Sequence, residues 1–200
     1  FSQGRKNLLF GQDGNDTLTG GDGPDRMFGG TGDDYLTDQT PHLINLSPDT
    51  MDGGPGNDEI NGDGGNDMLI GGLGDDLIYG ADGHDVVLGG AGKDTIFGDL
   101  SRPDRPAGYR DIIDAGADKD TVYGGAGHDL IKGGAGDDHL DGGKGYDFIY
   151  GGHGKDTLVG MQGDDRLVGG LDDDLLIGWA GQDTLVGQDG VDVMYGHRDV

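Results

Sequence analysis

The chain has 200 residues, 47 of them glycine, and a formal net charge of −26. Hydrophobic residues make up only 32% of the sequence, which excludes the large apolar core of an ordinary globular protein, and the acidity argues against nucleic acid as a partner because its phosphates would be repelled. The lack of cysteine and of any apolar run of 18 residues excludes a disulfide framework and a transmembrane helix.

The chain starts with a degenerate repeat and then becomes strictly periodic. It begins without Met and without a signal-peptide pattern, so we expect it to be a piece of a longer protein. Residues 1–10 read as a degenerate capping repeat, because Asn7 stands where later units have Asp and Leu9 occupies their apolar position. From Gly11 the sequence repeats every nine residues, in three units through Thr37.

Two longer stretches interrupt the repeat without breaking its register. A second block of five units covers residues 53–97, and a third block of nine units covers residues 115–195. Between the blocks, residues 38–49 and 98–111 each lead into the Asp and the apolar residue of one further unit. We therefore interpret each stretch as a single unit whose turn is lengthened, by six and eight residues respectively.

Residues 11–195 thus contain nineteen units of one array, and we predict that residues 1–200 form a single domain. Position 6 is Asp and position 8 is Leu, Ile, Val or Met in all nineteen units, and position 1 is Gly in 17 of them. Positions 7–9 predict a short strand whose middle side chain points inward. Positions 1–6 predict a turn that needs glycine at positive φ, and Asp118 and Asp172, which replace Gly at position 4, fit it because Asp tolerates the left-handed region.

The aspartates carry the chemistry of the repeat. The chain contains 38 Asp and one Glu, Glu59, which indicates that the shorter carboxylate is required at fixed places. The pattern G-G-x-G-x-D-x-U-x, with U a large aliphatic residue, resembles the calcium-binding nonapeptide of RTX (repeats-in-toxin) proteins. The resemblance covers nearly the whole chain. It implies an all-β fold, a parallel β-roll (right-handed β-solenoid) of about ten turns, with 18 residues in each turn. Both lengthened turns belong to even-numbered units, so we expect them on one edge.

The resemblance also implies calcium ions as cofactor, each held between the turn of one unit and the turn two units later. Neighbouring strands lie about 4.8 Å apart, roughly twice the calcium–oxygen distance of 2.3–2.6 Å, so an ion fits between two rungs. The implied carboxylate ligands are the position-6 aspartates Asp16, Asp25, Asp34, Asp49, Asp58, Asp67, Asp76, Asp85, Asp94, Asp111, Asp120, Asp129, Asp138, Asp147, Asp156, Asp165, Asp174, Asp183 and Asp192. The implied backbone carbonyl ligands include those of Gly125, Gly127, Gly134, Gly136, Gly143, Gly145, Gly152 and Gly154.

The number of ions follows from the number of paired turns. Nineteen units give 17 pairs of turns two units apart, nine on the edge of the odd-numbered units and eight on the other edge. The lengthened turns, with Asp49 and Asp111 at position 6, disturb four of the eight, so we predict roughly 13 calcium ions. Without the cation, carboxylates stacked within about 5 Å of one another repel, and we expect the chain to stay unfolded.

Other functions find less support. The segment lacks the H-E-x-x-H, G-x-S-x-G and G-K-[ST] motifs, so the sequence predicts no enzyme activity in it. An ice-binding solenoid needs a regular threonine array, whereas Thr31 is the one threonine at position 3. Apolar residues at position 9, such as Tyr79 and Phe97, fit either a solvated sheet or a docking face for a neighbouring domain of the same polypeptide.

The loops 38–49 and 98–111 leave two interpretations open. The second loop contains Arg102, Arg105 and Arg110, three of the seven arginines of the chain. These arginines either neutralise aspartates where calcium is missing, or the two loops together recognise a protein partner.

By resemblance, the chain is a calcium-binding module of a secreted bacterial protein. Such a module is unfolded at low calcium and folds outside the cell, where it supports type I secretion, so we expect an extracellular or cell-surface location. One alternative is a calcium-stiffened segment of an adhesin or surface-layer protein. Another is the non-catalytic module of a secreted enzyme or toxin. The sequence on either side of the chain would separate these alternatives.

Overall fold

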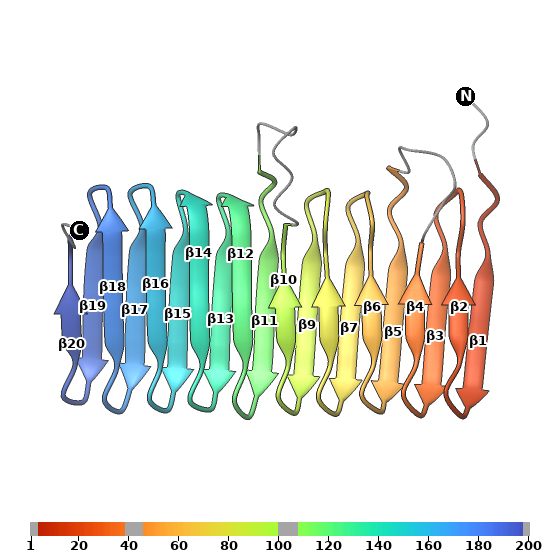
Figure 1. Cartoon of the computed structure of the whole chain (residues 1–200), viewed down its shortest axis with the longest axis horizontal. Helices are drawn as coiled ribbons and strands as arrows, with labels where there is room; N and C mark the ends of the chain where they lie inside the picture. The colour runs from red at the N-terminus through yellow and green to blue at the C-terminus, as the bar shows by residue number, and fades with distance from the viewer. Residues whose placement is uncertain (1–3, 39–45, 100–107, 198–200) are drawn as a thin grey trace.

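A computed structural model of the chain describes residues 4–38, 46–99 and 108–197. Within these residues the chain forms twenty strands, which assemble into two parallel sheets of ten strands each (Figure 1). None of the described segments is a helix long and apolar enough to cross a membrane.

The strands alternate between the two sheets along the chain. The first sheet contains β1 (Leu8–Asp13), β3 (Arg26–Thr31), β5 (Thr50–Pro55), β7 (Met68–Leu73), β9 (Val86–Ala91), β11 (Ile112–Ala117), β13 (Leu130–Ala135), β15 (Phe148–His153), β17 (Arg166–Leu171) and β19 (Thr184–Asp189). The second sheet contains β2 (Thr17–Thr19), β4 (Tyr35–Thr37), β6 (Glu59–Asn61), β8 (Leu77–Tyr79), β10 (Thr95–Phe97), β12 (Thr121–Gly127), β14 (His139–Gly145), β16 (Thr157–Gln162), β18 (Leu175–Ala180) and β20 (Val193–Tyr195).

Each strand pairs with the strand two places later in the chain, and equivalent repeat positions lie side by side. Ile131 of β13 is opposite Ile149 of β15, 18 residues later, so one turn of the solenoid contains two nonapeptides. Across the first lengthened turn Met27 pairs with Met51, and across the second Val87 pairs with Ile113. The predicted β-roll of about ten turns is confirmed, and the additional residues do not shift its register.

The parallel strands give the solenoid two distinct edges (Figure 1). We call the turns that follow the odd-numbered strands the odd edge and those that follow the even-numbered strands the even edge. Both lengthened turns follow even-numbered strands, β4 and β10, so they leave from the even edge, as predicted. Three rungs separate them in the strand order β5-β7-β9-β11. Residues 39–45 and 100–107 of these turns lie outside the described residues.

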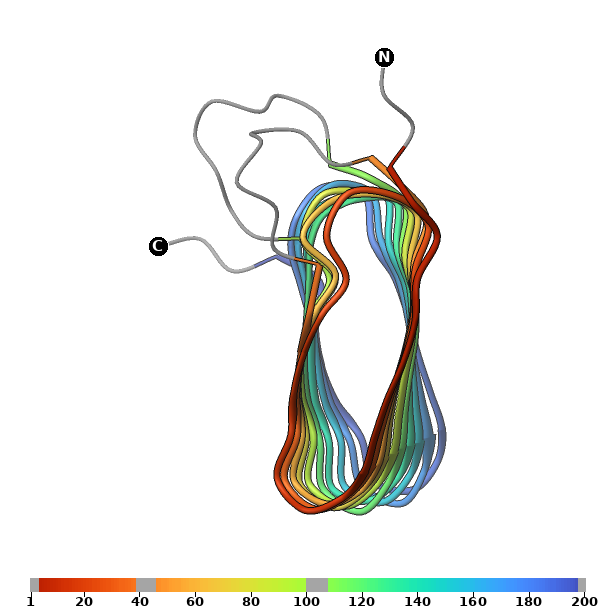
Figure 2. The same ribbon diagram turned by 90° about the vertical axis from the view of Figure 1, so that its right-hand side faces the viewer.

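The core is a single file of position-8 side chains between the two sheets, which face each other in the end-on view (Figure 2). Position-8 residues from Leu18 to Leu176 are buried there without a gap. Leu185 is partly buried and Met194, on the last rung, is 49% exposed. The prediction for position 8 therefore holds everywhere except at the C-terminal rung.

Position 9 lies on the outer faces. On the second sheet the rings of Tyr79, Phe97 and Tyr123 stack along the solenoid, with centroids 5.2 Å and 5.1 Å apart. Regular stacking follows from the register, because parallel pairing places identical positions on adjacent strands. A docking face at position 9 stays a prediction.

Candidate metal centres

The position-6 aspartates form two columns, one along each edge. Each aspartate follows a strand of its own rung and therefore lies beside its equivalents on the neighbouring rungs. The odd edge carries Asp16, Asp34, Asp58, Asp76, Asp94, Asp120, Asp138, Asp156, Asp174 and Asp192. The even edge carries Asp25, Asp49, Asp67, Asp85, Asp111, Asp129, Asp147, Asp165 and Asp183.

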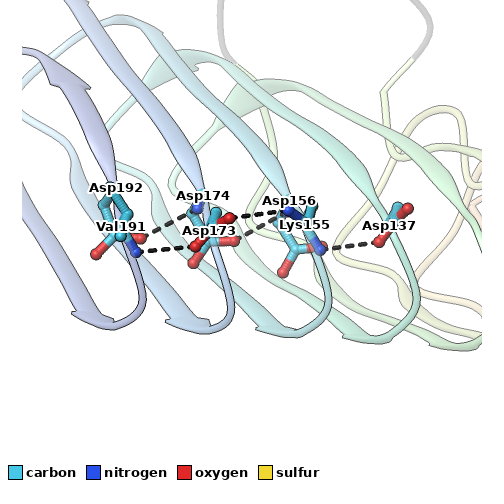
Figure 3. Close-up of polar contacts among 7 residues, drawn as sticks. All are labelled: Asp137, Lys155, Asp156, Asp173, Asp174, Val191 and Asp192. Atoms are coloured by element: carbon cyan, nitrogen blue, oxygen red, sulfur yellow. Dashed lines mark hydrogen bonds and ion pairs between the residues drawn. The ribbon is translucent and has the colours of Figure 1, made fainter.

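One carboxylate oxygen of each aspartate holds the neighbouring rung in place. The backbone N–H of Asp138 donates to Oδ1 of Asp156 over 2.9 Å, and that of Asp156 donates to Oδ1 of Asp174 over 2.9 Å (Figure 3). The same bond spans both lengthened units, where Asp25 donates to Asp49 over 2.5 Å and Asp85 donates to Asp111 over 2.9 Å. At the N-terminal end Asn7 occupies the equivalent place and donates its N–H to Asp25. Oδ1 therefore contributes to the structure of the solenoid on every rung.

The other carboxylate oxygen, Oδ2, points into the turn. In every position-6 aspartate except Asp192, Oδ2 is buried and lacks a hydrogen-bond partner among the described residues. Asp156, for example, is 1% exposed. Leaving one buried acceptor unsatisfied costs about 1–3 kcal/mol, and more when it is charged, so a whole series of them requires a common explanation. A row of cations between the rungs supplies one.

Glycine at position 1 keeps space free beside each of these oxygens. Position 1 faces inward, and a Cβ on Gly62 would lie 2.7 Å from Oδ2 of Asp67 and 2.8 Å from the carbonyl oxygen of Gly80 on the next rung. A side chain there would fill the place where the carboxylate and the carbonyl converge. The constant glycine at position 1 is therefore explained by this cradle and not by its backbone conformation.

Positive φ angles occur instead at positions 2 and 4 of the turn. Asp118 and Asp172 at position 4 have φ values of 81° and 77°, which confirms the prediction for both residues. At these positions the carbonyl groups point along the solenoid, so a Cβ on Gly152 would overlap the carbonyl oxygen of Gly134 and one on Gly154 that of Gly136. The turns thus present backbone oxygens between successive rungs. Whether the glycines named in the sequence analysis bind an ion stays a prediction.

Burial changes the acidity of the columns. It raises the pKa of Asp156 from 3.8 to about 7, although the hydrogen bond from the Asp138 N–H opposes the shift. The pKa of Asp67 rises to about 8 and that of Asp111 to about 9, mainly through burial and further through neighbouring carboxylates. A nearby cation favours the ionised form, so these groups are ones whose charge a divalent cation would stabilise.

A second ladder at position 5 was missed by the sequence reasoning. Along the odd edge, Oδ1 of Asp137 accepts the N–H of Lys155 over 2.9 Å, and Oδ1 of Asp173 accepts that of Val191 over 3.0 Å (Figure 3). On the even edge histidines take the same role: Nδ1 of His84 accepts the N–H of Arg110 over 2.8 Å. The frequent Asp, Asn and His at position 5 are the signal that could have revealed it.

The loop residues are only partly placed. Tyr109 stacks edge-on against His84, and Arg110 lies close enough to Asp129 for its positive charge to oppose the rise in pKa that burial imposes on that carboxyl. This contact favours neutralisation for Arg110. Arg102 and Arg105 lie outside the described residues, so the proposed partner site at the loops stays a prediction.

The donor set of an ordinary rung consists of short carboxylates and backbone carbonyls only. Calcium takes six to eight oxygen ligands in flexible geometry, which suits this set, whereas zinc and copper sites require nitrogen or sulfur donors. The buried oxygens and the glycine cradles therefore fit calcium.

Comparison with known proteins agrees with this chemistry. A family model of the RTX calcium-binding nonapeptide repeat matches residues 3–37, 46–78, 70–101, 107–131, 132–167 and 159–194. The chain belongs to the RTX calcium-binding repeat family. Its RTX repeats span both lengthened units as well as the regular ones.

Solved structures include a relative of this RTX array in fold. The crystal structure of a hyperactive, Ca²⁺-dependent, β-helical antifreeze protein from an Antarctic bacterium aligns with a TM-score of 0.50 and 22% sequence identity, over 94% of this chain and 83% of that one. At this identity the likeness concerns the fold alone. No curated protein gives a significant match.

Proposed function

We propose that this chain is a calcium-responsive folding module of a secreted bacterial protein. It is unfolded at the low calcium level of the cytoplasm, leaves the cell through a type I secretion channel, and folds when it meets calcium outside. RTX calcium-binding repeats are typical of extracellular proteins, which supports an extracellular location.

The observation that carries the proposal is the series of buried, unpartnered Oδ2 atoms in two columns. Keeping one such group ionised is costly: for Asp156, the rise of its pKa to about 7 corresponds to on the order of 4 kcal/mol at higher pH. The chain repeats this cost on nearly every rung and has few apolar residues to offset it. A cation that binds the folded state only would shift the equilibrium toward folding.

Weak sites suit the proposed switch. Extracellular calcium modules bind with dissociation constants of about 10⁻⁴–10⁻³ M, which leaves them empty in the cytoplasm and filled outside. About 13 ions would carry a charge of similar size to the net charge of the chain, −26.

A calcium titration followed by far-UV circular dichroism tests the proposal. In excess chelator we expect no β signal, and we expect the signal to develop cooperatively near millimolar calcium. Magnesium is the control, and it should act poorly because it prefers octahedral geometry at about 2.0–2.1 Å and gives up its waters reluctantly. A full β signal in chelator at neutral pH would refute the proposal.

Two other roles use the same calcium sites. The chain is either a stiff spacer of an adhesin or surface-layer protein, or the non-catalytic module of a secreted enzyme or toxin. Sequencing the gene on both sides separates them: an upstream catalytic motif with a downstream secretion signal favours the toxin or enzyme, and tandem sandwich domains favour the adhesin.

A further inference from the structure

The first lengthened turn brings a third carboxylate into the even column. Asp38 stands at position 1, where 17 of the units have glycine, and its side chain is 0% exposed. Carboxylate oxygens of Asp25, Asp38 and Asp49 lie within 4.8 Å of one another, and no other group of three possible metal ligands is this close among the described residues. Three buried carboxylates therefore converge on one rung interval.

The place of Asp38 in the turn is that of a ligand in an ordinary rung. A Cβ on Gly20 would lie 2.6 Å from Oδ2 of Asp25 and 2.9 Å from Oδ1 of Asp38. At Gly80 the corresponding atoms are Oδ2 of Asp85, at 2.7 Å, and the carbonyl oxygen of Gly98 on the next rung, also at 2.7 Å. A charged oxygen thus stands beside the cradle of Gly20 where an ordinary rung has a neutral carbonyl.

Two of the three aspartates present oxygens that need a partner. Oδ2 of Asp25 and Oδ2 of Asp49 are buried without a hydrogen bond, and the residues are 1% and 2% exposed. Their Oδ1 atoms are occupied, because Asp25 Oδ1 accepts the N–H of Asn7 and Asp49 Oδ1 accepts that of Asp25. The free oxygens face the cluster, and the side chain of Asp38 lies within hydrogen-bond reach of that of Asp49.

The charge of this rung differs from that of all the others. In an uninterrupted column each aspartate is shared by the intervals above and below it, which leaves about one carboxylate for each ion. Asp38 raises this number to about two. The affinity of calcium sites is set by the number of charged ligands and by their rigidity, so the interval between Asp25 and Asp49 should differ from the rest.

We propose that Asp25, Asp38 and Asp49 together hold one calcium ion, and that this site binds calcium more tightly than the sites of the ordinary rungs. The inference rests on the proposed function, because it takes calcium as the ion of the array. It assigns to the lengthened turn a site of its own, stronger than the disturbed one that the sequence suggested. A tight site near the start of the array also gives folding a place to begin, because in a repeat array structure can nucleate at one unit and spread to its neighbours.

The experiment compares two substitutions that remove the same charge. Asp38→Asn keeps the size of the side chain and loses the anionic ligand. The control, Asp22→Asn, removes a carboxylate from the same turn as Asp25, at an exposed position. Denaturant unfolding of the full chain at several calcium concentrations gives two quantities, the unfolding equilibrium constant and, from its dependence on calcium, the number of ions released on unfolding.

We expect Asp38→Asn to raise the unfolding equilibrium constant at 10 mM calcium at least tenfold, and to reduce the number of released ions by up to one. Asp38→Gly, which restores the residue of the other units, should give the same reduction. Asp22→Asn should leave both quantities unchanged or stabilise the chain slightly, because it relieves repulsion.

The sign of the effect decides the inference. If Asp38 only repels its neighbours, Asp38→Asn will stabilise the chain, and the proposed site is wrong. A loss of stability with an unchanged number of released ions would show a structural role without calcium and would overturn it as well. If the wild-type chain itself releases no calcium, the proposed function fails together with the site. A calcium-responsive wild type that Asp38→Asn leaves unchanged overturns the site alone.

Discussion

Replacing Asp156 by Asn separates the two roles of a column aspartate. Oδ1 of Asp156 accepts the N–H of Asp138 over 2.9 Å, and the amide oxygen of Asn can accept the same bond. Oδ2 is buried and unpartnered, and the amide that replaces it is neither anionic nor a calcium ligand at its nitrogen. The substitution therefore preserves the ladder between the rungs and weakens the two calcium sites that Asp156 shares with Asp138 and Asp174.

The expected size of the effect follows from the affinity of the sites. With dissociation constants of 10⁻⁴–10⁻³ M, one site contributes about 1.4–2.7 kcal/mol at 10 mM calcium. Two sites lost together reduce the free energy of unfolding by about 3–5 kcal/mol. At 0.5 mM calcium the same calculation gives a loss of only about 0.5–2 kcal/mol. The loss of stability in Asp156→Asn should therefore depend on calcium.

Denaturant unfolding followed by circular dichroism at both calcium concentrations measures this difference. Asp137→Asn is the matched control, because Asp137 is exposed, precedes a column aspartate and accepts a backbone N–H through Oδ1, in this case from Lys155. It loses the same charge, and its stability should stay within about 0.5 kcal/mol of the wild type. Equal losses in the two variants, or a loss in Asp156→Asn that is the same at both calcium concentrations, would refute the assignment of Oδ2 as a calcium ligand.

Three further predictions follow from the columns and the turns. Asp156→Ala should raise the calcium midpoint of folding more than Asp111→Ala, which affects only sites beside a lengthened turn; equal midpoints in the titration would contradict this order. In chelator, acidification from pH 8 to pH 5 should increase the β signal, because folded-state pKa values raised to about 7, as for Asp156, make protonation stabilise the fold, fully below about pH 4 and no longer above about pH 7; a signal independent of pH would be inconsistent with these shifts. Gly134→Ala should destabilise the chain by more than Gly14→Ala in denaturant unfolding, because both glycines have positive φ but only the Cβ at Gly134 would overlap a carbonyl oxygen, that of Gly116; equal losses would mean that φ alone matters.

The sequence was sufficient for the register and insufficient for the contacts between rungs. The constant Asp at position 6 and the apolar residue at position 8 place Met51 opposite Met27 across a lengthened turn, and the structure pairs these two residues. The pattern could not reveal that Oδ1 of each aspartate bonds to the next rung, because this depends on a side-chain direction between residues 18 apart. For the same reason the pattern did not reveal the acceptor role of His84.

The position-1 glycines show where sequence reasoning was incomplete. Tight turns explain glycine at positions 2 and 4, where φ is positive, as at Gly134. Position 1 has a different cause, the space beside a carboxylate oxygen, and this cause becomes visible only when the neighbouring rung is in place. Asp38 looked like a defect of the repeat for the same reason, and in the structure it joins two buried carboxylates.

The lengthened turns also bear on how such an array can diversify. Backbone partners are 18 residues apart in the regular rungs and 24 or 26 apart across the two lengthened turns. Chain-closure entropy grows only with the logarithm of the separation, so these additions cost about 0.3 kcal/mol each. An insertion into a turn at the even edge is thus nearly neutral thermodynamically, whereas one inside a strand would shift Asp and apolar positions out of line. Evolution can therefore vary the even-edge turns freely, which makes them suitable places to graft a foreign peptide onto the solenoid.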